Sequence, residues 1–320
     1  DQIFYLTAKS ITAAVAQDAY QLLRQKENLH FKTVTLTAKE KVCLNEVCAC
    51  NPDECPYASG HFDRINRALF SLLNEKEVYT WQVVQEKAAS ACVCPFELSL
   101  DLSLFCDGII CDYNYLFDPF VYLKRFFAAQ MAHRYLFLID EAHNLLERGR
   151  KMYSAELLQE DFAILRASIR KESGFARVLE ELEQSENAFL RVPLESSRKK
   201  ETETCVVERI DSFADHMSRL YRAISSYLDN HRTKVRNERL LPFVFQLNRF
   251  LVIYEKSDKR YRYLVQNTEK GRAVRILCLD PSEDLKACME LGRGSILFSA
   301  TFLPIQYYKQ LLGGTKEDYE

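Results

Sequence analysis

Short runs of apolar, β-favouring residues recur along the chain, and stretches of helical periodicity separate them. The runs cover residues 3–7, 33–37, 108–111, 136–139, 276–279 and 296–299. Most of these runs are continuous instead of alternating, which is typical of parallel strands that are buried on both faces. Helices are predicted to begin at Ser10, a favourable N-cap residue, and near Phe62, and to cover 78–90. This alternation predicts an α/β fold with a doubly wound parallel sheet.

The pattern changes between about Gly149 and Asn267. Long amphipathic segments at 157–169, 206–228 and 240–254 replace the strand-like runs there. We therefore expect a mainly helical insertion in the α/β domain, with the sheet resuming at Val274. The 320 residues correspond to about two domains of ordinary size.

Composition and charge narrow the class of protein. The chain is 48% hydrophobic and 28% charged, with 9 Gly and 8 Pro, which excludes a disordered or low-complexity chain. Its longest wholly apolar runs fall far short of the ~20 residues that a transmembrane helix needs, and no basic-then-apolar leader begins it. We therefore expect a cytoplasmic protein without a membrane partner. Its net charge of −2 excludes an overall basic surface, so nucleic acid would have to bind a local patch or a lined channel.

The chain has eleven cysteines, and most of them lie in its first third. An odd number in a cytoplasmic protein favours metal ligation or buried thiols over a disulfide framework. Cys106 and Cys111 adjoin an apolar run and are best interpreted as small buried hydrophobic residues. The other six in this region fall in predicted loops: Cys43, Cys48, Cys50, Cys55, Cys92 and Cys94. Four of these thiolates could hold zinc or a [4Fe–4S] cluster, and their spacing does not distinguish the two.

The sequence Asp-Glu-Ala-His at 140–143 directly follows the apolar run at 136–139. Ligand crevices form at the carboxyl ends of parallel strands. In a nucleotide hydrolase the first carboxylate of such a pair helps to hold Mg²⁺, and the second orients and deprotonates the attacking water. The other interpretation is a solvated helix N-terminus with acids near its positive dipole end. The Ser-Ala-Thr sequence at 299–301, after another predicted strand, favours the hydrolase.

The order of these segments resembles the superfamily 2 iron–sulfur DNA helicases of the XPD and DinG kind, most of all their bacterial DinG-related members. The resemblance extends along essentially the whole chain, through 4–10, the cysteine-rich segment, 112–119, the DEAH sequence and 299–301. It implies a P-loop-NTPase-like (RecA-like) parallel sheet domain with an iron–sulfur insertion and a helical arch insertion. In this family the motor and both insertions enclose single-stranded DNA, and ATP hydrolysis drives 5′→3′ translocation and duplex opening.

The resemblance also implies a division of the chain. Residues 1–40, 96–148 and 271–320 would form the first motor domain, 41–95 the iron–sulfur domain and 149–270 the arch. The P-loop string Gly-x-x-x-x-Gly-Lys-[Ser/Thr] does not occur, and 302–320 is too short for a second motor domain. We therefore expect an internal piece of a helicase, which does not hydrolyse ATP at a useful rate by itself.

The resemblance assigns the catalytic roles by position. Asp140 and Glu141 match the acid that holds Mg²⁺ and the acid that activates water. His143 matches the residue that couples the nucleotide site to Ser299 and Thr301.

Four further residues match DNA-binding positions of the family. Thr7 and Lys9 fall in the motif that touches the DNA backbone. Tyr113 and Asn114 lie in a strand-end loop that could face the channel. An aromatic ring there could stack on a base, but a buried tyrosine with a satisfied hydroxyl is an equal alternative.

The resemblance favours a [4Fe–4S] cluster over zinc. Cys43 matches the first ligand and Cys94 the last, and Cys50 and Cys55 best match the middle two. Cys48 and Cys92 lie two residues from presumed ligands and are possible substitutes.

We accordingly expect part of an ATP-dependent DNA helicase that is monomeric, binds single-stranded DNA and serves DNA repair, with RNA or a hybrid left open. The alternative is a catalytically inactive module that binds nucleic acid or a partner and contains a structural metal site.

Overall fold

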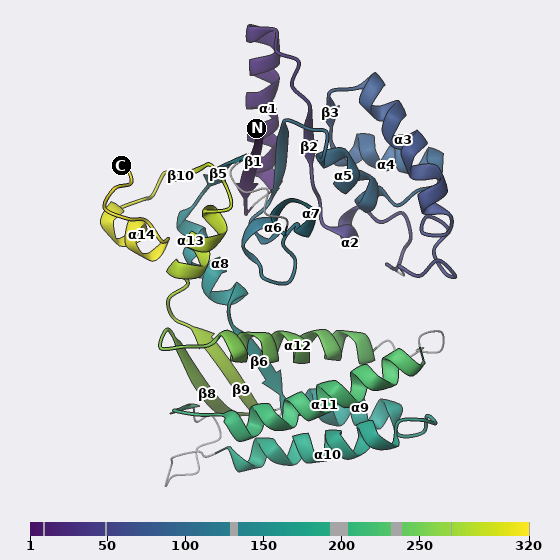
Figure 1. The fold of residues 1–320 in the computed structure, drawn as a ribbon, viewed down its shortest axis with the longest axis vertical. Coiled ribbons are helices and arrows are strands. Elements are labelled where there is room, and N and C mark those ends of the chain that lie inside the picture. The colour runs from purple at the N-terminus through teal and green to yellow at the C-terminus, as the bar shows by residue number, and fades with distance from the viewer. Residues whose placement is uncertain are drawn as a thin grey trace. The chain divides into compact units, whose positions relative to one another are not determined.

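The computed structural model describes residues 1–8, 10–48, 50–128, 134–192, 204–231, 239–269 and 271–319, with backbone only at 10 and 11. These residues form two compact units (Figure 1). Unit 1 comprises Asp1–Leu146 and Ser282–Glu320, and unit 2 comprises Glu147–Pro281. No helix in these described ranges is both long and apolar enough to cross a membrane.

Unit 1 contains a six-stranded sheet in the order β10-β5-β1-β4-β2-β3, and every pairing in it is parallel. The strands are β1 Gln2–Thr7, β2 Thr33–Thr35, β3 Val78–Tyr79, β4 Gly108–Asp112, β5 Tyr135–Asp140 and β10 Gly294–Phe298. The predicted α/β fold with a parallel sheet is thus confirmed. The helix predicted over 78–90 begins later, because Thr80 accepts a hydrogen bond from the Val83 amide and caps a helix that starts at Trp81.

Helices surround this sheet. They are α1 Ser10–Glu27, α2 Lys39–Val42, α3 His61–Glu75, α4 Trp81–Ala91, α5 Pro95–Ser103, α6 Asn114–Phe117, α7 Lys124–Phe127, α8 His143–Met152, α13 Ser282–Met289 and α14 Ile305–Leu311. Helices α3, α4 and α5 pack against one another, and α5 also packs against β2 (Figure 1). The cysteine-rich segment between α2 and α3 therefore belongs to a small helical cluster beside the sheet.

An aromatic cluster fills the core of unit 1. Phe4 in β1 is completely buried, and its ring centroid lies 5.2 Å from that of Phe126, 5.5 Å from that of Tyr135 and 5.9 Å from that of Phe137. Such edge-to-face pairs add to the free energy gained by burying the rings. This packing holds β1 firmly between its neighbours.

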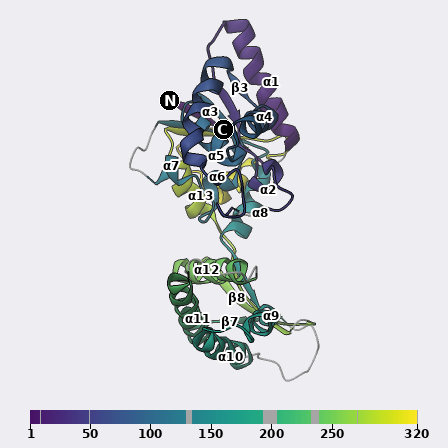
Figure 2. The same ribbon diagram turned by 90° about the vertical axis from the view of Figure 1, so that its right-hand side faces the viewer.

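Unit 2 combines helices with a four-stranded antiparallel sheet in the order β6-β9-β8-β7. Its elements are β6 Ala155–Leu158, α9 Gln159–Ile169, α10 Ala176–Arg191, β7 Thr204–Val207, α11 Asp211–Asn230, α12 Leu240–Lys256, β8 Tyr261–Thr268 and β9 Gly271–Cys278. The helices pack in succession, α12 against α11, α11 against α10 and α10 against α9 (Figure 2). The sequence predicted the helices of this region but not its sheet.

The interpretation of 276–279 as a parallel strand is wrong. Ile276 lies in β9 and pairs with Tyr263 in the antiparallel neighbour β8. Burial in β9 alternates from Val274 onward, and Arg275 points to the less buried face, where it forms an ion pair of 2.6 Å with Glu156. An alternating pattern of this kind is typical of an antiparallel strand with one covered face.

Candidate functional site

The two predicted nucleotide-site motifs meet at the carboxyl edge of the parallel sheet. Strands β5 and β10 are neighbours, and Phe298 at the end of β10 pairs with Asp140 at the end of β5. The Ala142 amide donates a hydrogen bond of 3.1 Å to the Phe298 carbonyl. Sequences at 140–143 and 299–301 therefore lie side by side, although more than 150 residues separate them.

Hydrogen bonds join the side chains of these motifs. His143 Nδ1 lies 2.7 Å from Ser299 Oγ and 3.3 Å from Glu141 Oε2, and Ser299 Oγ donates to Glu141 Oε2 at 3.3 Å. The Thr301 amide donates to Ser299 Oγ at 3.2 Å. The structure therefore brings Glu141, His143, Ser299 and Thr301 into one network, which we call the coupling network. A displacement of the 299–301 segment would therefore change the hydrogen bonds that the Glu141 carboxylate accepts.

The backbone at Glu141 has a φ of +50°, in the left-handed region that residues with a Cβ atom adopt infrequently. Glu141 lies between the end of β5 and the start of α8. Conformations of this kind concentrate at functional sites, where the surrounding structure has to maintain them. Here the coupling network supplies side-chain contacts that hold the turn.

Two tyrosines fix Asp140. The Tyr5 hydroxyl donates to Asp140 Oδ2 at 2.9 Å, and the Tyr113 hydroxyl donates to the Asp140 carbonyl. Burial and the adjacent Asp140 carboxylate raise the pKa of Tyr5, so this hydroxyl stays protonated as a donor.

Tyr113 is completely buried, so neither face of its ring is open to a base. The prediction that Tyr113 stacks on DNA is therefore not supported. The structure has the buried tyrosine with a satisfied hydroxyl that was the alternative.

The site can be tested for the metals that the resemblance implies. Among the described residues, no group of three or more His, Cys, Asp or Glu side chains is arranged to hold a metal ion. Mg²⁺ does not need such a group, because it binds proteins through one or two carboxylates together with substrate phosphates. The half-exposed, adjacent carboxylates of Asp140 and Glu141 fit that requirement. A [4Fe–4S] cluster needs four sulfur ligands, and Cys43, Cys50, Cys55 and Cys94 do not form such a group in this structure.

The cysteines nevertheless share one region. Cys50 and Cys94 raise the pKa of Lys39 in α2 against the effect of its burial, and the Cys48 thiol donates a hydrogen bond of 4.0 Å to the Lys39 carbonyl. Cys55 is buried, and its sulfur accepts a hydrogen bond of 3.1 Å from the side-chain amide of Asn45.

Cys106 and Cys111 are each 2% exposed. This burial agrees with their interpretation as small hydrophobic residues.

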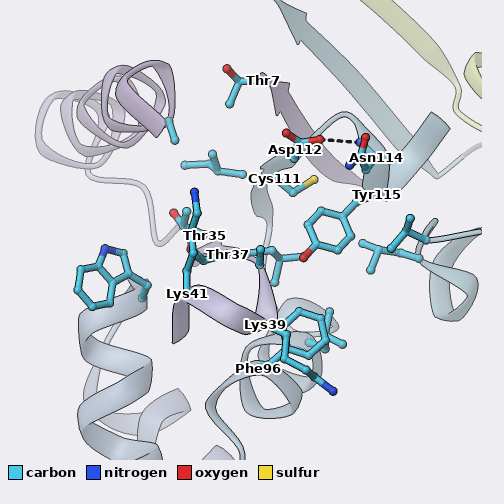
Figure 3. A pocket seen from close by; sticks show the side chains of 18 of the residues that line it. Thr7, Thr35, Thr37, Lys39, Lys41, Phe96, Cys111, Asp112, Asn114 and Tyr115 are labelled. Atoms are coloured by element: carbon cyan, nitrogen blue, oxygen red, sulfur yellow. Dashed lines mark hydrogen bonds between the residues drawn. The ribbon is translucent and has the colours of Figure 1, made fainter. Parts of the chain in front are cut away.

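A large cavity of about 1330 Å³ lies at the carboxyl ends of β1, β2 and β4 (Figure 3). We call it the strand-end groove. Thr7 and Asn114, two of the predicted DNA-binding residues, line it, and Lys9 lies outside the described residues. The backbone amide of Asn114 donates a hydrogen bond of 2.9 Å to Asp112 Oδ1 (Figure 3). Thr7 is 4% exposed, and its hydroxyl hydrogen-bonds with that of Thr12.

Basic side chains outnumber acidic ones among the described residues of the groove. The basic residues are Lys39, Lys41, Lys124 and Arg125, and the acidic ones are Glu40 and Asp112. Arg125 forms an ion pair of 2.8 Å with Asp101, and Lys39 one of 3.5 Å with Glu97. Lys41 and Lys124 are exposed and have no ion-pair partner in the part of the chain that is described. Neither lysine was predicted from the sequence, because a single lysine next to a loop or in a short helix carries no signal.

Comparisons with known proteins agree with this architecture. Residues 24–162 match the family model DEAD_2. A solved structure named XPD_Helicase aligns with a TM-score of 0.59 and 15% identity, covering 98% of this chain and 53% of its own. A second, named Truncated XPD, aligns with a TM-score of 0.56 and 15% identity, covering 98% of this chain and 85% of its own. The comparison with curated proteins gives no match.

These matches agree with the resemblance to helicases of the XPD kind, and the fold is that of the XPD structures. The chain spans about half the length of the first of the two structures.

The hydrogen bond between His143 and Ser299 can be tested by a double-mutant cycle on the free energy of unfolding. We expect His143→Ala and Ser299→Ala to be coupled by about 0.5–1.5 kcal/mol, because each change removes the same bond. The matched control pairs His143→Ala with Ser90→Ala, whose hydroxyl bonds to Lys87 instead, and these two changes should be additive. Additivity in both cycles would contradict the coupling network.

Proposed function

We propose that the chain is part of an ATP-dependent DNA helicase in which ATP hydrolysis drives 5′→3′ movement along single-stranded DNA and opens duplexes. The observation that carries this proposal is the coupling network, which joins Glu141 to Ser299 and Thr301 beside the strand-end groove. Within the proposal, the division into motor segments, iron–sulfur domain and arch is the one expected from the sequence, except that residues 271–281 belong with the arch because β9 pairs in the sheet of unit 2.

The proposed roles at the nucleotide site follow from the contacts of each side chain. Mg²⁺, when bound with ATP, neutralises charge on the phosphates. Tyr5 holds Oδ2 of Asp140, so the carboxylate has a fixed orientation toward such an ion. Glu141 orients the attacking water and accepts its proton. His143 bonds to both Glu141 and Ser299, so the position of the 299–301 segment sets the position of that base.

Strand β1 connects the nucleotide site with the groove. Tyr5 contacts Asp140, and Thr7, two residues further along the same strand, lines the groove. Residues two apart in a strand lie on the same face. Binding of DNA against the end of β1 would therefore act on the strand that holds the proposed Mg²⁺ ligand. This short connection supports coupling between DNA and ATP.

In the groove, Lys41 and Lys124 are placed to neutralise phosphates of a single strand, and Asn114 to contact its backbone. Single-stranded DNA in the groove would pass the carboxyl ends of β1, β2 and β4. The protein would contact its phosphates and sugars and would not have to reach bases inside a duplex.

The proposed ligands of a [4Fe–4S] cluster are Cys43, Cys50, Cys55 and Cys94. Support comes from the resemblance and from the position of Lys39, whose pKa both Cys50 and Cys94 raise. The described residues from 43 to 60 contain no helix or strand, so a four-sulfur arrangement would require only this loop to move.

We expect Cys43→Ser and Cys94→Ser to lose iron, because a cluster with three sulfur ligands is poorly held. Cys111→Ser is the matched control and should keep its iron, since Cys111 is buried in β4. The measurement is iron per chain after anaerobic purification. Full iron in either of the first two variants would show that the ligand assignment is wrong.

The phosphate contacts can be tested through the salt dependence of binding to an oligo-dT of twelve nucleotides. Lys41→Ala and Lys124→Ala should each weaken binding and reduce the slope of log K against log salt by about 0.7, the value for one contact to a single strand. Lys26→Ala, an exposed residue of α1 outside the groove, should leave the slope unchanged. Equal effects of all three changes would contradict binding in the groove.

Binding alone is also expected of the inactive module, so catalysis needs its own test. In the full-length protein that carries this chain, Glu141→Gln should lower kcat for DNA-stimulated ATP hydrolysis by roughly 10²- to 10⁴-fold, because the general base is removed. Unwinding of a duplex with a 5′ single-stranded tail should be lost, and oligo-dT binding should persist. If the unsubstituted protein neither hydrolyses ATP nor unwinds this duplex, the inactive module is the correct description.

A further inference from the structure

Trp81 is the only tryptophan of the chain, and it lines the strand-end groove. Its side chain is 43% exposed. A large aromatic ring that is left open on the wall of a cavity points to a ligand with a flat apolar face. We infer that the Trp81 indole stacks on a nucleobase of the single strand held in the groove. This inference rests on the proposed function and adds the residue that contacts a base.

The position of Trp81 is fixed by its helix. It is the first residue of α4, whose start is capped by Thr80 and whose Val84 and Ala88 are buried. Helix α4 packs against both α3 and α5. Helical side chains lean toward the N-terminus, so a residue in the first turn of α4 is placed to reach past the start of the helix. A ring on a rigid first turn can stack with little loss of conformational entropy.

The other walls of the groove favour a nucleic acid as the occupant. The exposed Lys41 and Lys124 supply positive charge, and Ala13 and Ala14 of α1 are small residues that leave space. The volume of about 1330 Å³ exceeds the range of roughly 300–1,000 Å³ that is usual for small-molecule pockets. Cations together with an open aromatic ring form the usual combination in sites for single strands, in which the charge follows the phosphates and the ring receives a base.

The two kinds of contact have different experimental signatures. A phosphate contact changes the salt dependence of binding, whereas a stacked ring contributes equally at every salt concentration. Stacking also requires a base, so an oligonucleotide without bases would not gain from it.

The test is a fluorescence titration of the chain with the oligo-dT of twelve nucleotides. Because Trp81 is the sole tryptophan, any quenching of tryptophan emission comes from this position. Trp81→Ala should weaken binding about 5- to 150-fold without changing the salt slope, and Trp81→Phe should recover most of the affinity. Phe62→Ala, which removes an 87% exposed ring of α3 outside the groove, is the matched control and should bind like the unsubstituted chain. An abasic strand of the same length should bind the unsubstituted chain and Trp81→Ala equally.

The outcomes separate the inference from the function on which it rests. Binding of oligo-dT that depends on Lys41 but neither quenches Trp81 nor weakens in Trp81→Ala would overturn stacking and leave the proposed DNA binding intact. No binding by the unsubstituted chain would overturn both. A poly-glutamate peptide that quenches Trp81 at the same affinity as oligo-dT would also overturn the inference, since the groove would then recognise charge alone. If Trp81→Ala does not fold, stacking is tested by the quenching of Trp81 in the unsubstituted chain and by comparing Trp81→Phe with Trp81→Leu. Stacking predicts that Trp81→Phe, which keeps an aromatic ring, binds oligo-dT more tightly than Trp81→Leu.

Discussion

The parallel pairing of β1 with β4 on one side and β5 on the other is the constraint on which the rest of unit 1 depends. Its register places Thr7 opposite Asp112 and Leu6 opposite Ile139, so three strands end at the same edge of the sheet. That edge holds Asp140 on one side of β1 and the strand-end groove on the other. The buried ring of Phe4 keeps β1 in this register, because a slip by one residue would turn Phe4 to the opposite face.

The same edge gathers residues that are distant along the chain. After β5 the chain leaves the sheet, forms unit 2 and returns to pair β10 with β5. This return brings Ser299 to His143 and Glu141. The coupling network therefore forms only when β5 and β10 are paired. The proposed link between DNA and ATP therefore needs no long-range pathway. It consists of one strand and a few hydrogen bonds.

Sequence patterns predicted the elements whose signal is local. The run at 136–139 is apolar and followed by acids, and it forms a central strand with Asp140 at its end. The two-residue strand β3 and the sheet of unit 2 were missed, because short or half-covered strands lack a continuous apolar run. The buried state of Tyr113 depends on tertiary packing, which no local pattern contains. The thiols were located by composition, but their mutual arrangement depends on the path of a loop without secondary structure.

The account is tested most directly by photochemical cross-linking of an oligo-dT strand that carries photoreactive bases, with the attachment sites mapped by mass spectrometry. If the carboxyl edge of the sheet is the DNA path, cross-links will fall in peptides that contain 35–41, 81–82 and 112–125, all of which border the groove. Cross-links that spare these peptides and fall on the exposed face of α3 or in unit 2 alone would contradict it.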